Sequence, residues 1–462
     1  MNARVIWSLV ATTVVAAVAW PAFMRAGAAS PETAPVPGWT AAPVIADYAN
    51  RDALVSTYEA DAKRNPRDQI IATMLAGQYL QRYREQADVG DLLRAENEAQ
   101  RSLRLQPRYN INADMTMASA LTAFHQMRPA LAYAEEASRI VPSSFSARAA
   151  IANLDMELGD YTSAKDELTS RPIDDDPNWD ISLARYDELT GHLASARTII
   201  DGVQRRMDEV VDNPAETRAW THWRQGELAF AAGDTRDAII HYKEALAIFP
   251  GYWHGYDGLA KAYWASGDWP DALEYASKGA DVYPLPEVLG FEYDAQIALG
   301  QRGNAARTLD LLYAIERIGN AQGMNDRLIA MFYADHGLRA DDAVAIARRD
   351  LARRDDIYAE DTLAWTLAAD GRWPEARTHS ERAVRLGTED ARLQYHAGII
   401  ALHCGDRGEA RRRLEHALSL NPRFNPFQAH DAERTVAAME RSTFMVDRRG
   451  LSASRSEAAR PR

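Results

Sequence analysis

The chain has 462 residues, a length that suits two or three ordinary globular domains or one long repeat array. An apolar share of 47% allows extensive burial, while a net charge of −13 argues against the basic surface that nucleic-acid phosphates require. The single cysteine, Cys404, excludes an intramolecular disulfide and a two-cysteine metal motif, and we expect it to be a small buried residue.

The N-terminal segment has the pattern of an export signal. Arg4 precedes an apolar run from Val5 to Phe23, and small residues follow at 26–29. A positive flank, an apolar core and an Ala-x-Ala site are typical of a secretory signal peptide, but about 20 apolar residues also suffice to span a bilayer. Residues 1–30 are therefore either a cleaved signal peptide or a membrane anchor. Both place the rest of the chain outside the cytoplasm, in the periplasm or cell envelope, with only this segment meeting the membrane.

Two short segments separate this signal from the body of the chain. Residues 31–44 are rich in Pro, Ala, Gly and Thr and predict a flexible linker. Residues 45–66 predict a helix. We expect it to cap the fold, because a repeat array needs a polar end.

The body of the chain repeats a unit of about 34 residues. Residues 219–250 have the pattern of a helix, a turn at Gly233-Asp234, a second helix and a closing Pro250. Residues 253–284 repeat the same order. Closing prolines recur at Pro107, Pro142, Pro250, Pro284 and Pro422. The sequence therefore predicts a series of helix pairs, each ended by a proline that cannot continue the helix.

A small residue recurs at one position of the unit, where a larger side chain would push the two helices apart. The alanines at this position are Ala95, Ala130, Ala164, Ala196, Ala238, Ala272, Ala306, Ala343, Ala376 and Ala410. Glycines precede them by five residues at Gly90, Gly159, Gly191, Gly233, Gly267, Gly371 and Gly405, and by six at Gly300 and Gly337. Each glycine is predicted to end the first helix of its pair in a left-handed conformation.

The turn residues also predict how the second helices begin. Asp234, Asp268 and Asp406 follow their glycines and can cap the next helix by accepting from its free amides. Pro270 and Pro374 fall in the first turn, where the missing N–H is not needed.

This pattern resembles the tetratricopeptide repeat family, in which each unit is an antiparallel helix pair. The matching residues in one unit are Tyr256, Leu259, Ala260, Tyr263, Gly267, Ala272 and Pro284. The resemblance extends from about Asp68 to Pro422 and implies an all-α, right-handed superhelical solenoid of about ten repeats over residues 67–425. It is weak around Ala306 and Ala343, where we expect long helices. The wide gap before Ala238 predicts a lengthened second helix over 193–211.

Beyond the repeats the chain changes character. Residues 426–445 predict a C-terminal capping helix, and residues 446–462 a disordered basic tail.

No enzyme motif occurs in the sequence, which lacks a nucleophile elbow, a zinc-protease helix, a phosphate-binding loop and a dinucleotide-binding loop. His396 and His403 could share a helix face, but two polar tips at a solvated surface explain them better than a metal site without a third ligand. The acidic run 174–176 lacks the glycine and closing glutamate of a calcium loop and is read as a solvated turn. We therefore expect no catalytic residue, no metal and no cofactor.

The resemblance places inward-facing side chains on the first helix of each unit, and in this chain they are unusually aromatic. Clustered aromatic side chains on a concave surface are typical binding anchors. The predicted partner-binding positions are Trp220, Trp223, Glu227, Phe230, His254, Asp257, Lys261, Trp264, Phe291, Tyr358, Trp365, Arg392 and Tyr395. An error of one residue in register would turn groove into core, so both interpretations stay open for Trp220, Trp223 and Trp264.

Three functions are compatible with these features. The first is a non-catalytic extracytoplasmic scaffold that binds a protein or peptide partner in its groove. The second is a component of envelope polysaccharide synthesis or secretion, in which aromatic rows stack on sugar rings. The third, an enzyme, is disfavoured because no catalytic motif is present.

Overall fold

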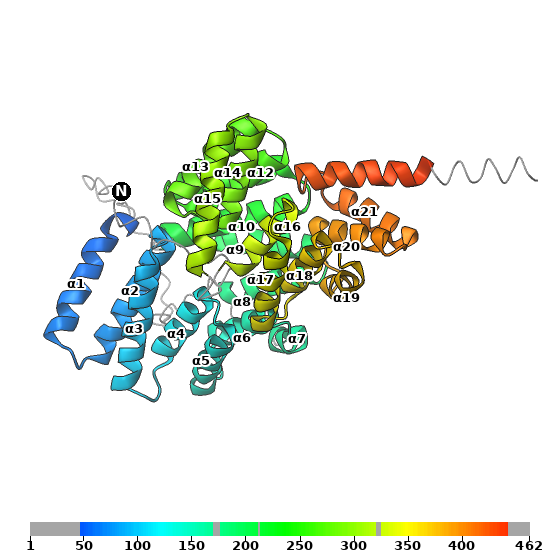
Figure 1. Cartoon of the computed structure of the whole chain (residues 1–462). Helices are drawn as coiled ribbons and strands as arrows, with labels where there is room; N and C mark the ends of the chain where they lie inside the picture. The colour runs from blue at the N-terminus through cyan, green and yellow to red at the C-terminus, as the bar shows by residue number, and fades with distance from the viewer. Residues whose placement is uncertain (1–46, 170–175, 211–212, 320–324, 442–462) are drawn as a thin grey trace, which may run out of the picture.

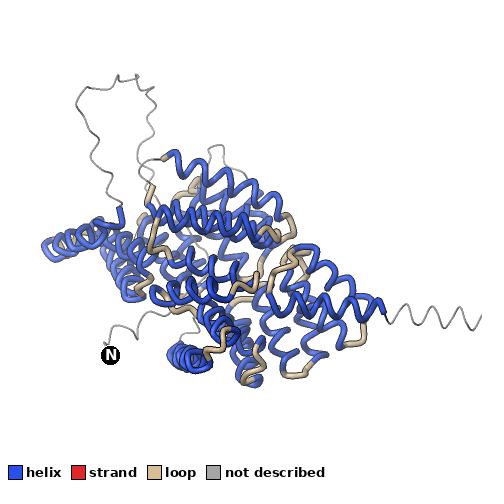
Figure 2. The backbone as a smooth tube through the Cα atoms, turned by 90° about the horizontal axis from the view of Figure 1, so that it is seen from above, coloured by secondary structure: helices blue, strands red, loops and turns tan. Residues whose placement is uncertain are grey.

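The computed structural model describes residues 47–169, 176–210, 213–319 and 325–441, and every regular element in those ranges is a helix (Figures 1 and 2). The predicted all-α fold is confirmed. The predicted signal peptide or anchor, the linker, the residues from 442 onward and Asp174 and Asp175 lie outside the described residues. Within the described ranges, no helix combines the length and apolarity that a membrane span needs.

Ten helix pairs follow one another in the described part of the chain. A 3-10 turn η1 (Asp47–Asn50) and helix α1 (Arg51–Arg64) precede them, and a helix at 426–441 follows. The pairs are α2 (Gln69–Gln86) with α3 (Val89–Leu105), α4 (Ile111–Ala123) with α5 (Met127–Ile140), α6 (Phe145–Glu157) with α7 (Tyr161–Thr169), α8 (Pro177–Leu189) with α9 (Leu193–Glu209), α10 (Ala215–Ala231) with α11 (Thr235–Ile248), α12 (Trp253–Ala265) with α13 (Trp269–Val282), α14 (Pro286–Ala298) with α15 (Arg302–Gly319), α16 (Asp326–Asp335) with α17 (Ala340–Arg353), α18 (Ile357–Ala369) with α19 (Trp373–Ala383), and α20 (Ala391–His403) with α21 (Arg407–Leu420).

The recurring alanines lie where the helices of a pair meet. Nine of the ten predicted alanines are 0% exposed, as small residues at a tight helix crossing should be. Ala306 is the exception, because it is exposed and its neighbour Ala305 takes the buried position at 2% exposure. The prediction was wrong by one residue there. Ala305 follows Gly300 by the ordinary five residues, so this unit keeps the common spacing.

The turns within the pairs are left-handed, as predicted for most of the glycines. Gly159, Gly191, Gly233 and Gly267 have φ between 73° and 79°, and Gly300, Gly337, Gly371 and Gly405 also have positive φ. Gly90 does not fit, because it lies inside α3. The turn before α3 is made instead by Ala87 at φ 56°, and the turn before α5 by His125 at φ 57°. Both bear the steric cost that a β-carbon adds in this conformation.

The predicted helix starts are confirmed in part. Asp234 accepts from the amide of Asp237 at 3.3 Å and Asp406 from that of Glu409 at 3.1 Å, but Asp268 makes no such bond. Pro270 and Pro374 stand in the first turns of α13 and α19.

The expected long helices are also found only in part. Helix α9 has 17 residues against 14 in α11, and α15 has 18, whereas α17 has 14 and is not lengthened. Cys404 is half-buried rather than fully buried, and its Sγ donates to the carbonyl of Trp373 at 3.5 Å.

Successive turns of this superhelix touch one another. The Ile357 amide donates to the Tyr161 hydroxyl at 2.9 Å, across 196 residues. The Leu193 amide donates to Glu389 at 3.2 Å, again across 196 residues, and the Asn421 side chain donates to the Phe230 carbonyl at 2.7 Å across 191. Each contact joins one pair to a segment five to six pairs later. Successive turns of the array therefore pack on one another in a stack, and we term this packing between turns closure.

The two ends of the array join this stack. The Ala215 amide donates to Asp47 at 3.0 Å, so η1 rests on the start of α10. At the other end, Phe427 packs against Trp264 and Trp269 with ring centroids 6.2 and 6.0 Å apart. Figure 1 shows α1 to α5 side by side at one end of the molecule and the helix at 426–441 at the other.

Candidate ligand-binding cavity

A cavity of about 340 Å³ lies inside the stack. Its lining comes from the first helices of seven successive pairs, α8 to α20, and from residues 421–425 after α21. Volumes of about 300–1,000 Å³ are usual for sites that hold small ligands or short segments.

Ten of the thirteen predicted positions line this cavity. They are Trp223, Glu227, Phe230, His254, Asp257, Lys261, Trp264, Phe291, Tyr358 and Arg392. The agreement concerns their place in the fold, and their role in binding a partner stays a prediction.

The other three predicted positions, Trp220, Trp365 and Tyr395, lie outside the lining. Trp220 belongs to the apolar core around α10 and is 6% exposed. The indole N–H of Trp365 donates to Asp335 at 2.8 Å, and the Tyr395 hydroxyl donates to Asp431 at 3.1 Å. The side chains of Trp365 and Tyr395 are therefore held by neighbouring helices.

Aromatic rings build one wall of the cavity. Trp264 packs on Phe291 with ring centroids 5.0 Å apart, and Trp223 packs on His254 at 4.4 Å. The Trp264 indole N–H donates to Asp294 at 2.8 Å. Trp223 and Trp264 are only 6% and 8% exposed, so each belongs to the core and to the cavity wall at once.

Paired charges form a second part of the lining. Arg185 donates to Glu188 at 2.7 Å, and Arg224 contacts the same carboxylate. Although burial alone would raise the pKa of Glu188, the two guanidinium groups lower it to about 2. Lys261 donates to both oxygens of Glu227 at 2.6 Å. Each of these charged side chains thus has a counter-ion, which offsets the cost of taking it out of water.

Three buried polar atoms of the lining have no hydrogen-bond partner among the described residues: Trp223 Nε1, His254 Nδ1 and Asp257 Oδ1. Burial raises the pKa of Asp257 well above its ordinary value, and the nearby Glu287 raises it further. Burial lowers the pKa of His254 well below its ordinary value, with Lys261 adding to the effect. Buried polar groups without a partner are rare and costly in native proteins.

Three further charged side chains of the lining are not paired. Arg327, Arg392 and Glu287 make no side-chain hydrogen bond or ion pair within 4.0 Å to any residue that the structure describes. Burial lowers the pKa of Arg392, but the nearby carboxylates of Asp390 and Glu287 raise it by more. The net shift is upward, so Arg392 stays charged. The cavity thus offers free cations and a free carboxylate beside its aromatic wall.

The register of the repeats hid several lining residues. Asp294, Phe332 and His336 line the cavity from α14 and α16, where the landmarks were displaced and the resemblance was weak. The loop at 421–425 follows the last pair, where the repeat pattern predicted a closing proline at Pro422 but no cavity lining. A register taken from Ala305 rather than Ala306 would have assigned α14 and α15 correctly.

The two histidines considered for a metal site do not act together. His396 is fully buried, and its Nδ1 lies 2.9 Å from Asp361. His403 is exposed and stacks on Trp373 with ring centroids 3.8 Å apart. In the acidic run, Asp176 caps α8 by accepting from the amide of Asn178 at 2.8 Å.

Comparison with known proteins gives one family match. The model of a tetratricopeptide repeat family matches residues 229–291, from the end of α10 into α14. No curated protein matches the chain.

Solved structures give distant likenesses. A human IFIT1 dimer with m7Gppp-AAAA is 15% identical, with 73% of this chain and 77% of that chain covered and a TM-score of 0.47. The human IFIT1 dimer with PPP-AAAA is 16% identical, covering 73% and 78% with a TM-score of 0.42. Yeast Tom70 is 13% identical, covering 85% and 93% with a TM-score of 0.33. Because each TM-score is below 0.5, we draw no functional conclusion from them.

Proposed function

We propose that this chain, which is a tetratricopeptide repeat protein, is a non-catalytic scaffold that takes a short segment of a protein partner into its central cavity. Stacked helix repeats present binding surfaces on their first helices, and the cavity lies on those helices. No constellation of nucleophile, base and orienting group was found among the lining residues, so binding explains the cavity better than reaction.

The observation that carries the proposal is the set of buried, unpartnered atoms Trp223 Nε1, His254 Nδ1 and Asp257 Oδ1. An extended peptide offers an N–H donor and a C=O acceptor at every residue other than proline. It can therefore satisfy a donor such as the Trp223 indole and an acceptor such as the Asp257 carboxyl together.

The other lining groups favour the same kind of occupant. The aromatic wall of Trp264 and Phe291 accommodates an apolar side chain, and Arg392 and Glu287 accommodate polar or charged ones. The cavity volume of about 340 Å³ suits a segment of a few residues rather than a whole helix.

We place this scaffold outside the cytoplasm, in the periplasm or cell envelope. The apolar run from Val5 to Phe23 after Arg4 is the support for that setting. It also leaves open the choice between a cleaved signal and a retained anchor.

The experiment is affinity capture of partners from envelope and cytoplasmic extracts with the full chain and two variants. Arg392→Gln removes a free charge with little change of shape, and Trp223→Phe removes the unpartnered indole N–H but keeps a ring. We expect the wild-type chain to capture a protein from the envelope extract. That protein should bind each variant at least about tenfold more weakly, which is the scale of losing one buried polar contact.

Arg412→Gln is the matched control, because Arg412 lies on α21 with a side chain 71% exposed, away from the cavity. It should capture the partner as the wild type does. Equal capture by all three variants would remove the cavity from the interaction. Enrichment of glycan in place of protein would favour the polysaccharide hypothesis, and capture only from cytoplasm would contradict the proposed setting.

A further inference from the structure

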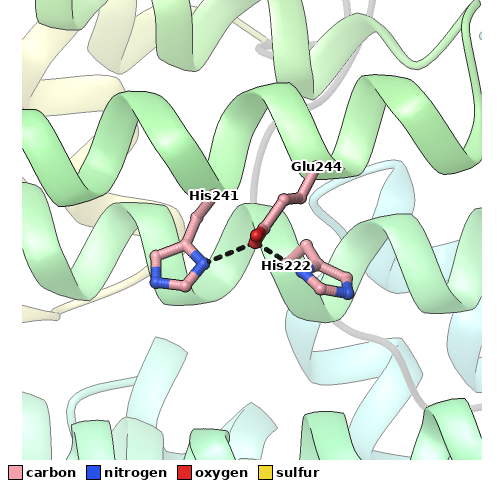
Figure 3. A group of neighbouring side chains, drawn as sticks. All are labelled: His222, His241 and Glu244. Carbon is pink, nitrogen blue, oxygen red and sulfur yellow. Dashed lines mark hydrogen bonds and ion pairs between the residues drawn. The ribbon is translucent and has the colours of Figure 1, made fainter.

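Two histidines and a glutamate meet outside the cavity, between helices α10 and α11. His222 lies on α10, and His241 and Glu244 lie one turn apart on α11 (Figure 3). None of the three lines the cavity. Imidazole nitrogens and a carboxylate oxygen are the donors that Zn²⁺ takes most often besides thiolates.

The spacing of the three donor atoms is close to that of a metal site. Glu244 Oε2 lies 3.1 Å from His222 Nδ1 and 2.9 Å from His241 Nδ1. Each of the three residues offers one ligand atom that lies within 4.8 Å of those of the other two. A tetrahedral Zn²⁺ ion about 2.0–2.1 Å from each ligand places neighbouring ligand atoms roughly 3.4 Å apart. Small side-chain rotations are enough to reach that geometry, as Figure 3 shows both rings turned toward the carboxylate.

Each histidine also has a carboxylate on the far side of its ring. His222 Nε2 lies 3.5 Å from Asp208, and His241 Nε2 lies 3.8 Å from Asp237. Histidines that bind metals usually donate their second N–H to such a group, which fixes the tautomer and the ring orientation. Asp208 and Asp237 thus lie near the second nitrogen of each ring, and the Gln204 amide nitrogen lies 3.4 Å from His222 Nε2.

Local charge and access also suit a cation. Arg218 holds Asp208 at 3.1 Å and Arg197 holds Asp237 at 3.3 Å, so three carboxylates face two guanidinium groups. The Glu244 side chain is 45% exposed, while those of His222 and His241 are 11% and 21% exposed. An ion can therefore enter from solvent and keep a water as its fourth ligand.

We propose that His222, His241 and Glu244 form a site for one Zn²⁺ ion that ties α10 to α11. Binding through Nδ1 leaves the ring proton of each histidine on Nε2, the side on which Asp208 and Asp237 lie. The ion joins the two helices of one pair at rigid positions, next to the lengthened helix α9.

The test is a Zn²⁺ titration of the metal-stripped full chain against a chromophoric chelator, with native mass spectrometry to count bound ions. We expect one ion per chain, no such ion in His222→Ala or His241→Ala, and binding about 10–100-fold weaker in Asp208→Asn, as for loss of a partner behind a metal ligand. X-ray absorption should place nitrogen and oxygen ligands at about 2.0–2.1 Å.

His430→Ala is the matched control, because His430 and Glu433 have the same helical spacing but lie 3.9 Å apart without a second histidine. Its binding should equal that of the wild type. Circular dichroism of each variant separates loss of Zn²⁺ binding from loss of folding. If His222→Ala does not fold, the Zn²⁺ titration of His241→Ala tests the site. The proposal is overturned if the wild type binds no ion, or if His222→Ala and His241→Ala bind Zn²⁺ as tightly as the wild type does.

Discussion

At the residue scale, Asp257 is a buried carboxyl group with an oxygen that has no hydrogen-bond partner in the described part of the chain. It is 5% exposed, and its Oδ1 has no partner among the described residues. Burial and, after it, the charge of Glu287 raise its pKa well above the ordinary 3.8. Between 3.8 and the raised value, the folded chain holds a proton that the unfolded chain releases.

The stability of the protein should therefore fall as the pH rises through that window, by the contribution of this one group. The Asp257→Asn side chain cannot titrate. The melting temperature of this variant minus that of the wild type should therefore increase as the pH rises from about 4. Thermal melts at several pH values measure the difference. Asp166→Asn, at an exposed position on α7, should show no such trend. A difference for Asp257→Asn that does not change with pH would contradict the assignment.

Individual residues of the cavity could be predicted where the repeat pattern was strong. Trp223, Asp257 and Lys261 come from units that carry every landmark and line the cavity, although Trp220, from the same unit as Trp223, does not. The pairing of Lys261 with Glu227 and the unpaired state of Asp257 could not be predicted, because they depend on side-chain directions that the spacing does not contain.

At the scale of helices, the pattern predicted where each pair turns but not which side chain caps it. Asp268 occupies the same sequence position as Asp406, yet only Asp406 bonds to an amide of its helix. The residues that follow differ, because Asp268 precedes Trp269-Pro270 and the proline has no amide N–H to donate, whereas Asp406 accepts from the amide of Glu409. At Gly90 the position of the turn itself was predicted wrongly. Gly90 lies inside α3, and Ala87 forms the turn in a left-handed conformation that its β-carbon disfavours.

This pair of aspartates gives a matched test of capping. Asp406→Ala should lower the free energy of unfolding by about 1 kcal/mol, the usual loss when a capping side chain is removed. Asp268→Ala should lower it by less than half of that, because no bond is lost. Urea unfolding of both variants measures the two values. Equal losses would show that the cap at Asp406 contributes nothing of its own.

At the scale of the molecule, the contacts between superhelical turns depend on glycines that serve twice. Gly159 has φ 78°, and a β-carbon there would lie 2.1 Å from the carbonyl oxygen of Asp355, five to six pairs later. Gly267 has φ 73°, but a β-carbon there would meet nothing within 4 Å. The first glycine thus satisfies its own turn and the packing of the next superhelical turn, whereas the second satisfies its own turn alone.

Substitution of each by alanine separates the two requirements. Gly267→Ala should cost about 1–2 kcal/mol of unfolding free energy, from the left-handed conformation alone. Gly159→Ala should cost clearly more, because the backbone of a distant pair must also move. Thermal and urea unfolding of the two variants provide the comparison. Equal costs would mean that the superhelical turns do not press on each other at this point.

The sequence predicted the array of pairs, since a local period is enough for that, but not its closure. Neither Tyr161 and Ile357 nor Leu193 and Glu389 carry any signal of their contact across 196 residues. Such contacts depend on small rotations between neighbouring pairs that add up over five or six units.

Closure also limits how this chain can change during evolution. Open repeat proteins gain and lose whole units easily, because each unit touches only its neighbours. Here, duplication or deletion of a unit between Tyr161 and Ile357 would shift every later pair. Those pairs would then no longer face the pairs that they contact in the previous superhelical turn. The length of the array is therefore fixed by its own geometry, and variation in this protein should occur by substitution within units rather than by changes in their number.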